Sequence, residues 1–163
     1  MSLSASGWGT ATGRGACRFN GPVEYETIAR IKRSVSIPVF ANGEIADRDM
    51  ALEVLEQTGA DGVMIGRASL GAPWLPGQIA GVAAELPLEE KLEVIVEHLV
   101  LGHAFYGEPG IRIMRKHVQW YFEKLTELRD AEWRRNWVRA FNGLTSTDAQ
   151  LAALEGLFPA LAA

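Results

Sequence analysis

The sequence predicts a mixed fold, α/β followed by all-α, on three observations. Two short apolar runs, IPVFA at 37–41 and GVMI at 62–65, flank one helical pattern, as in a βαβ crossover of two parallel strands. Glycine and proline then recur from Pro76 to Pro87, as they do in a linker. Beyond the linker, apolar residues follow helical spacing in four stretches with short connections, which predicts a small four-helix bundle.

The first part of the chain, residues 1–23, is expected to be irregular or disordered. Its opening, MSLSASGWGTATG, is small and polar and shows almost no periodicity. Cys17 is the only cysteine, which excludes an internal disulfide and a cysteine metal cluster and is typical of a reducing cytosol. We therefore expect a structural role for Cys17.

Residues 24–80 are expected to form the α/β part. Helical spacing predicts a helix over Glu24–Val35. A second helix should begin at Asp47 and end at Gly59, because these residue types cap helices at those ends, and its apolar side includes Leu52. Residues 69–74 read as the start of a further helix that prolines interrupt.

Two polar loops follow the two strands and form the first candidate site. Asn42-Gly43 ends the first strand and Gly66-Arg67 follows the second. Because neighbouring parallel strands point their carboxyl ends to the same edge, these loops should lie together, where (β/α) folds bind phosphate. Glycine admits an anion close to backbone N–H groups, and Arg67 offers a fork of donors. The alternative is that the glycines only make turns and Arg67 forms a surface ion pair.

The second candidate site lies in the helical segment, 87–163. Helices are expected over Leu88–Tyr106, with Phe105 on its apolar side, and over Pro109–Leu125, Ala131–Phe141 and Asp148–Phe158. Four polar residues share the outward side of the second of these helices: Arg112, Arg115, Lys116 and Gln119. Residues 109–141 carry eight Lys/Arg against four Asp/Glu, so this surface could meet RNA phosphates. The alternative is an ordinary solvated helix face.

Composition describes a protein without a membrane segment or a metal centre. The chain is 48% hydrophobic and 22% charged, with a formal net charge of −4. Apolar runs fall far short of the roughly 18 residues that a membrane span needs, and no secretory pattern is evident, so we expect a cytoplasmic protein. His103 and His117 lack partners at metal-ligand spacing, so no metal site is expected.

Three separated stretches resemble the flavin-dependent tRNA-dihydrouridine synthases. IPVFANGEI with TGADGVMIGRASLGAPWL is similar to the family's pattern IPVIANGDI with TGADGVMIGRGALGNPWIF. CRFNGPVEYETIARIKRSVSIPV precedes that segment, and GIRIMRKHVQWYF follows it. The resemblance runs from about Gly13 to Phe158 and is highly specific, because three motifs agree.

The resemblance implies a fold and a chemistry. It makes 24–80 the C-terminal remnant of a flavin-binding (β/α)8 barrel, a partial TIM-barrel segment, and 87–163 a tRNA-binding-type helical domain. The family reduces uridine in tRNA to 5,6-dihydrouridine with FMN and NADPH. The implied cofactor-binding residues are Asn42, Gly43, Glu44 (where the family has Asp), Gly66 and Arg67, and the implied RNA-facing residues are Arg112, Arg115, Lys116 and Gln119.

Length argues against a complete catalyst. A (β/α)8 barrel needs about 200 residues or more, whereas this chain has 163 in all. The family's catalytic cysteine lies upstream of anything here, so no catalytic residue is assigned and the isolated chain is expected to be inactive. Two alternatives stay open, a non-catalytic RNA-binding module and a fragment of another FMN- or phosphate-binding (β/α)8 oxidoreductase. No DNA partner is expected. Two strands with open edges also predict a homodimer or larger assembly.

Overall fold

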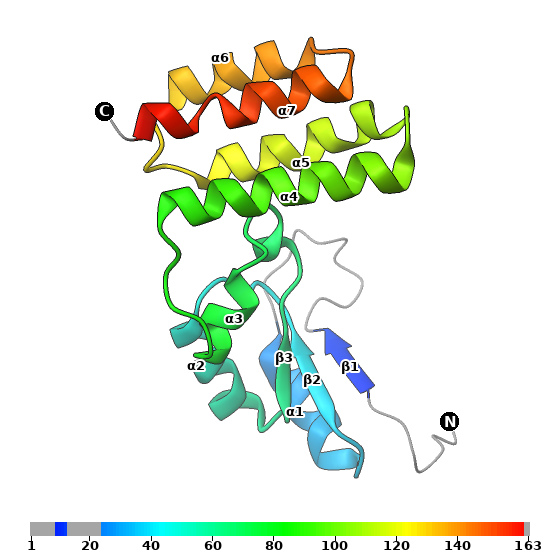
Figure 1. Ribbon diagram of the computed structural model, residues 1–163. Helices are drawn as coiled ribbons and strands as arrows, with labels where there is room; N and C mark the ends of the chain where they lie inside the picture. Colours follow the sequence, from blue (N-terminus) through cyan, green and yellow to red (C-terminus); the bar gives the residue numbers. More distant parts are fainter. Residues whose placement is uncertain (1–8, 13–23, 162–163) are drawn as a thin grey trace. The chain divides into compact units, whose positions relative to one another are not determined.

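The computed structural model describes residues 9–12 and 24–161, and the chain divides into two compact units (Figure 1). Residues 1–69 and 73–84 form the first, called here the α/β unit. Residues 70–72 and 85–163 form the second, the helical unit. Over the described ranges, every helix is too short or too polar to cross a lipid bilayer.

The α/β unit contains a sheet of three parallel strands in the order β1 (Gly9–Thr12), β2 (Val39–Asn42), β3 (Gly62–Met64). The prediction of two strands is therefore wrong, and so is the expectation of irregular structure at Gly9–Thr12. This segment pairs with β2 along its whole length. Backbone groups form the hydrogen bonds of a strand pair, so small and polar residues can take part, and the side chain of Ala11 is buried. The expectations for residues 1–8 and 13–23, Cys17 included, lie outside the described residues.

Helices α1 (Tyr25–Ser34) and α2 (Arg48–Thr58) pack against each other and against the sheet. As predicted, α2 begins after Asp47, whose carboxylate accepts a hydrogen bond from the N–H of Met50, and ends at Gly59 in the left-handed conformation. The core joins one face of the sheet to both helices through Ala11, Ile28, Val39, Ala41, Ile45, Ala51, Val54 and Ile79.

The chain after β3 differs from the prediction of an interrupted helix at 69–74 and a linker from Pro76. A short 3-10 helix, η1 (Arg67–Ser69), comes first, and helix α3 (Leu75–Ala80) follows after a turn. Pro76 lies in the first turn of α3, where a missing N–H costs no intrahelical hydrogen bond, so proline opens this helix instead of breaking it.

The helical unit contains α4 (Leu88–Tyr106), α5 (Gly110–Lys124), α6 (Ala131–Asn142), α7 (Thr147–Glu155) and the 3-10 helix η2 (Phe158–Leu161). Helix α5 packs against α4 and α6, and α4 also packs against α7. Gly102 lets α4 and α5 approach closely, because a Cβ there would overlap the Met114 thioether. The largest fully buried side chains of the unit are Phe122, Phe141, Leu92, Ile95, Leu99, Met114, Leu125 and Leu154.

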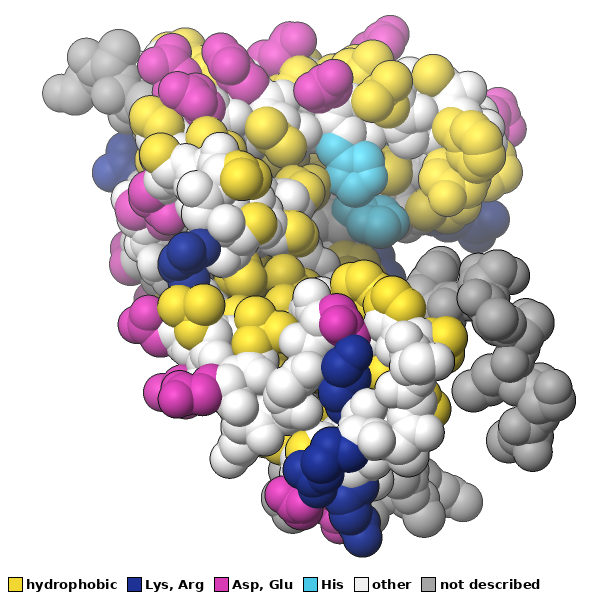
Figure 2. All heavy atoms as spheres, turned by 90° about the horizontal axis from the view of Figure 1, so that it is seen from below, with side chains coloured by type: hydrophobic (Ala, Val, Ile, Leu, Met, Phe, Trp, Pro, Cys, Tyr) yellow, Lys and Arg dark blue, Asp and Glu magenta, His cyan; other side chains and the backbone are white. Residues whose placement is uncertain are grey.

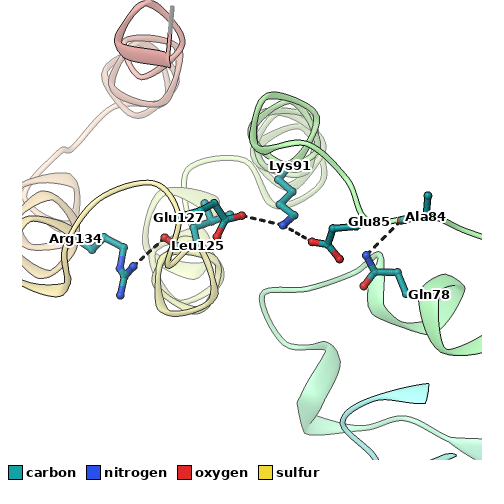
Figure 3. Close-up of polar contacts among 7 residues, drawn as sticks. All are labelled: Gln78, Ala84, Glu85, Lys91, Leu125, Glu127 and Arg134. Carbon is teal, nitrogen blue, oxygen red and sulfur yellow. Dashed lines mark hydrogen bonds and ion pairs between the residues drawn. The ribbon is translucent and has the colours of Figure 1, made fainter. Parts of the chain in front are cut away.

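A buried lysine fixes the entry to α4. Lys91 Nζ lies 2.7 Å from a carboxylate oxygen of Glu85 and 2.8 Å from one of Glu127 (Figure 3). Burial alone would lower the pKa of Lys91, but the hydrogen bonds to Glu127 and Glu85 raise it. Lys91 thereby links the stretch that precedes α4 to the loop between α5 and α6. The sequence pattern did not predict this contact.

Candidate functional site

The loop that leaves β2 is held in an unusual backbone conformation. Glu44 has a φ of 47°, the only positive φ of a non-glycine residue in the described ranges. Gly43 before it is buried, and its carbonyl oxygen accepts a 2.8 Å hydrogen bond from the Tyr25 hydroxyl of α1. Strained backbone that its surroundings hold in place is frequent at binding sites. Tyr25 therefore positions the loop, a role that the sequence pattern did not reveal.

The loop that leaves β3 starts from the same edge of the sheet. Asn42 pairs in register with Met64, and the Asn42 amide nitrogen lies 3.6 Å from the Met64 sulfur. Gly66 and Arg67 follow within three residues and are both exposed. A Cβ added at Gly66 would meet nothing within 4 Å, so its backbone is open to a small group. The pairing brings together the two loops that the sequence analysis singled out.

The chemistry of these residues fits an anion such as the phosphate of a flavin nucleotide. Backbone N–H groups and the Arg67 guanidinium are anion donors on a common sheet edge. A hollow of about 580 Å³ lies beside β3 and is lined by apolar side chains, among them Phe40, Val63 and Met64. It is open, and none of the predicted anion-binding residues lines it.

The four predicted RNA-facing residues of α5 have different surroundings. Arg112 is exposed, and the Lys116 ammonium lies over the Trp120 ring, 4.6 Å from its centroid. Arg115 is half-buried and donates a 2.8 Å hydrogen bond to the carbonyl of Leu144. The last of the four, Gln119, is exposed and donates to the Glu123 carboxylate at 2.9 Å. Only part of the set is therefore available to a polyanion as it stands.

Two histidines lie beside these residues. The rings of His98 and His117 are 5.0 Å apart, and His98 Nδ1 is 2.9 Å from the Tyr121 hydroxyl oxygen. Figure 2 shows histidine side chains gathered at one place, with hydrophobic side chains nearby. Burial lowers the pKa of both histidines and raises the pKa of Tyr121 to about 12. Both rings are thus mainly neutral at pH 7.

The buried His103 has a partner of another kind. Its Nε2 lies 2.9 Å from the side-chain oxygen of Gln150, whose amide donates to the carbonyl of Ile111. This contact ties α4, α5 and α7 together in the interior of the helical unit. Within the two described ranges, no three His, Cys, Asp or Glu side chains are placed to hold a metal ion.

Sequence reasoning missed the basic residues of α6. Arg134, Arg135 and Arg139 line a groove between α5 and α6. They contributed to the local excess of Lys and Arg, but helical spacing was considered only within α5. The pairing of α5 with α6, which sequence periodicity does not specify, is what brings these arginines next to Gln119.

Comparisons with known proteins agree over nearly the whole chain. The family model "Dihydrouridine synthase (Dus)" matches residues 13–158. A protein named tRNA-dihydrouridine synthase B from Pseudomonas aeruginosa is 46% identical over 147 residues, which are 86% of this chain and 42% of that protein. Its namesakes from Vibrio cholerae and Pectobacterium carotovorum are 43% and 42% identical, over 88% and 90% of this chain. The chain spans less than half the length of these relatives.

Proposed function

Because the chain belongs to the dihydrouridine synthase family, we propose that it supplies the C-terminal part of an enzyme that reduces uridine in tRNA to 5,6-dihydrouridine. One structural observation supports the proposal independently of the family membership. The anion-binding loops after β2 and β3 leave the sheet at one edge, through the Asn42–Met64 pairing. A cytoplasmic location, where tRNA is found, is part of the proposal.

In the proposed complete enzyme, the α/β unit binds the FMN phosphate. The ligands we assign are the N–H groups and side chains of Asn42, Gly43, Glu44, Gly66 and Arg67. The carboxylate of Glu44 suits a hydroxyl of the ribityl chain better than it suits a phosphate, because like charges repel. Bound flavin would pass hydride from NADPH to the uracil ring, and this chain's residues would hold its phosphate and exclude water there.

We further propose that α4 to α7 act as a four-helix bundle that grips tRNA. Arg112 and Lys116 are exposed on α5, and Gln119 lies on the same helix. Arg115, tied to Leu144, would orient the α6–α7 connection and contact RNA only through its remaining donors. The isolated chain would then bind tRNA weakly and reduce no uridine.

Open sheet edges suggest that this chain associates with a further polypeptide. In the described part of the sheet, β1 and β3 are the outer strands, and the apolar hollow with Phe40 and Met64 lies beside β3. Exposed edges and apolar faces favour association. A homodimer or larger assembly is therefore proposed, which sedimentation over a range of concentrations would test. A chain that stays monomeric throughout would overturn this part.

Flavin binding tests the central proposal directly. We expect added FMN to lose fluorescence on binding the chain, and inorganic phosphate to compete because it occupies the same donors. Arg67→Ala should weaken FMN binding roughly tenfold, the scale of one charge-assisted hydrogen bond. Arg33→Ala removes an exposed arginine of α1 and is the matched control. Equal FMN affinity for the wild type and the Arg67 variant would refute the assignment.

A further inference from the structure

A groove of about 610 Å³ lies between α5 and α6 of the helical unit. Apolar and polar side chains both line it, among them Gln119, Phe122, Arg135 and Arg139. Phe122 is only 2% exposed and is stacked on Trp137, with ring centroids 4.1 Å apart. The floor is therefore rigid and closed, and an occupant would lie across it without inserting a base.

Two arginines on the rim have donors to spare. Arg135 and Arg139 are exposed and lie one helical turn apart on α6. Across the described residues, Arg135 makes no hydrogen bond or ion pair, and Arg139 makes only a long 3.4 Å contact to the Asn136 side chain. Both guanidinium groups can thus turn toward a ligand without breaking a strong contact.

The third arginine has a structural task. Arg134 donates to the carbonyls of Leu125 and Arg129, at 3.0 Å each, and so holds the loop between α5 and α6 (Figure 3 shows the first contact). It fixes the backbone from which Arg135 projects. Because one nitrogen of its guanidinium group donates to both carbonyls, Arg134 is not assigned to the ligand.

Charge and spacing indicate the chemistry of the occupant. Helix α6 carries three arginines against one carboxylate, Glu132, and the carboxylate on the α5 side, Glu123, accepts a hydrogen bond from Gln119. Residues four apart on a helix lie about 6 Å apart, comparable with successive phosphates of one strand. Arginine forks match phosphate oxygens in two-point hydrogen bonds.

We propose that this groove takes the sugar–phosphate backbone of RNA, with Arg135 and Arg139 each contacting one phosphate. The inference rests on the proposed function only in taking the RNA to be tRNA. It adds a surface on α6 to the α5 residues Arg112 and Lys116. Because the groove offers phosphate donors and no exposed aromatic floor, binding there is independent of base sequence.

The test measures the affinity of the full chain for a labelled tRNA transcript between about 50 and about 200 mM salt. Arg135→Ala with Arg139→Ala should weaken binding at least tenfold and reduce the slope of log K against log salt by about 2, or about 1 for each arginine. Arg135→Lys with Arg139→Lys should keep most of the slope. Arg30→Ala with Arg33→Ala removes the same charge from exposed positions on α1 and should change neither value.

Several outcomes decide the proposal. If the alanine pair on α6 binds like the wild type while Arg112→Ala with Lys116→Ala binds weakly, the groove assignment fails and the proposed function stands. If no variant differs and the wild type shows no salt dependence, both fail. If acidic polyglutamate binds the wild type as tightly as tRNA and displaces it, the groove is a site for an acidic protein and the proposal is wrong. Unchanged circular dichroism must accompany any loss.

Discussion

The α/β unit and the helical unit differ in how completely each buries its own apolar residues. Four of the buried hydrophobic residues of the α/β unit are alanines, at positions 11, 29, 41 and 51, and the outer strands of its described sheet are β1 and β3. The helical unit instead buries Phe122 and Phe141 together with many leucines. Because burial of large apolar side chains dominates stability, the helical unit should be the more stable of the two.

The proposed cofactor-binding residues lie in the unit that should be the less stable of the two. The predicted anion-binding loops belong to the unit with the smaller side chains in its core and with open sheet edges. The helical unit presents its candidate RNA contacts from helices whose core contains large apolar side chains. We therefore expect the helical unit to protect its amides from hydrogen exchange for longer than the α/β unit does.

The largest effect should come from truncating a large, fully buried aromatic side chain of the helical unit. Phe122→Ala leaves a cavity beside Trp137, with an expected cost of about 3–5 kcal/mol in unfolding free energy. Phe105 is 80% exposed and provides the matched control, because Phe105→Ala should cost little. Urea unfolding followed by tryptophan fluorescence measures both. Equal losses would mean that the helical core is not the source of stability.

A steric test comes next in size. Gly71 has a φ of 72°, and a Cβ there would overlap the backbone carbonyl of Trp120. We expect Gly71→Ala to destabilise the helical unit by about 2–3 kcal/mol, from the clash and the left-handed conformation together. Gly107 has a φ of 63° and no atom within 4 Å of its added Cβ, so Gly107→Ala isolates the conformational part. Hydrogen exchange in α5 should quicken only in the first variant.

The charged contact at the start of α4 should have a smaller effect. Lys91→Met keeps the buried aliphatic stem but removes the ammonium, so Glu127 and Glu85 lose their partner. Both carboxylates can still reach water, which limits the expected cost to about 1–2 kcal/mol. Lys124→Met, at an exposed position, is the control and should leave the thermal midpoint unchanged. If Lys91→Met leaves the unfolding free energy unchanged, packing alone fixes the start of α4.

In the α/β unit, the test concerns the loop after β2. Tyr25→Phe removes the hydroxyl that donates to the Gly43 carbonyl and should cost about 1 kcal/mol. If Tyr25 positions the anion-binding loop, the free energy of FMN binding should weaken by more than the free energy of unfolding does. Tyr106→Phe, in the helical unit, should alter neither quantity. A Tyr25 variant that loses stability but keeps full FMN affinity would remove the positioning role.

The smallest expected effect is a pH dependence of the helical unit. Burial lowers the pKa of His98 and His117 below 6.5 in the folded state, so the unfolded chain takes up protons first as the pH falls. Stability should therefore be complete above about pH 6.5 and decline below it. Both rings are partly exposed, which keeps the effect small. Replacing both histidines by glutamine should make the thermal unfolding midpoint depend less on pH between about pH 5 and about pH 7.

Local chemistry made much of the fold predictable. Asp47 and Gly59 gave the two ends of α2, and the predicted bounds of α4 coincide with the observed helix. Capping and periodicity act within a few residues, so they can be read without knowing what packs against the segment. The parallel direction of β2 and β3 followed in the same way from the single helix between them.

Features that depend on distant partners were not predictable. Strand β1 is short and mostly polar, and only its pairing with β2 makes it a strand. Phe105 and Leu52 follow the apolar spacing of their helices, yet they are 80% and 51% exposed, because no element among the described residues covers that side. The arginine groove likewise requires α6 to lie against α5.

The assignment of residues 70–72 to the helical unit governs where the polypeptide can be divided. A protein expressed from Glu85 onward would lack Gly71, which lies against the Trp120 backbone, and Ala72, which is 7% exposed. Truncation between residues 84 and 85 would therefore leave the end of α5 uncovered. A fragment that contains the helices should fold by itself only when residues 70–72 are supplied as well.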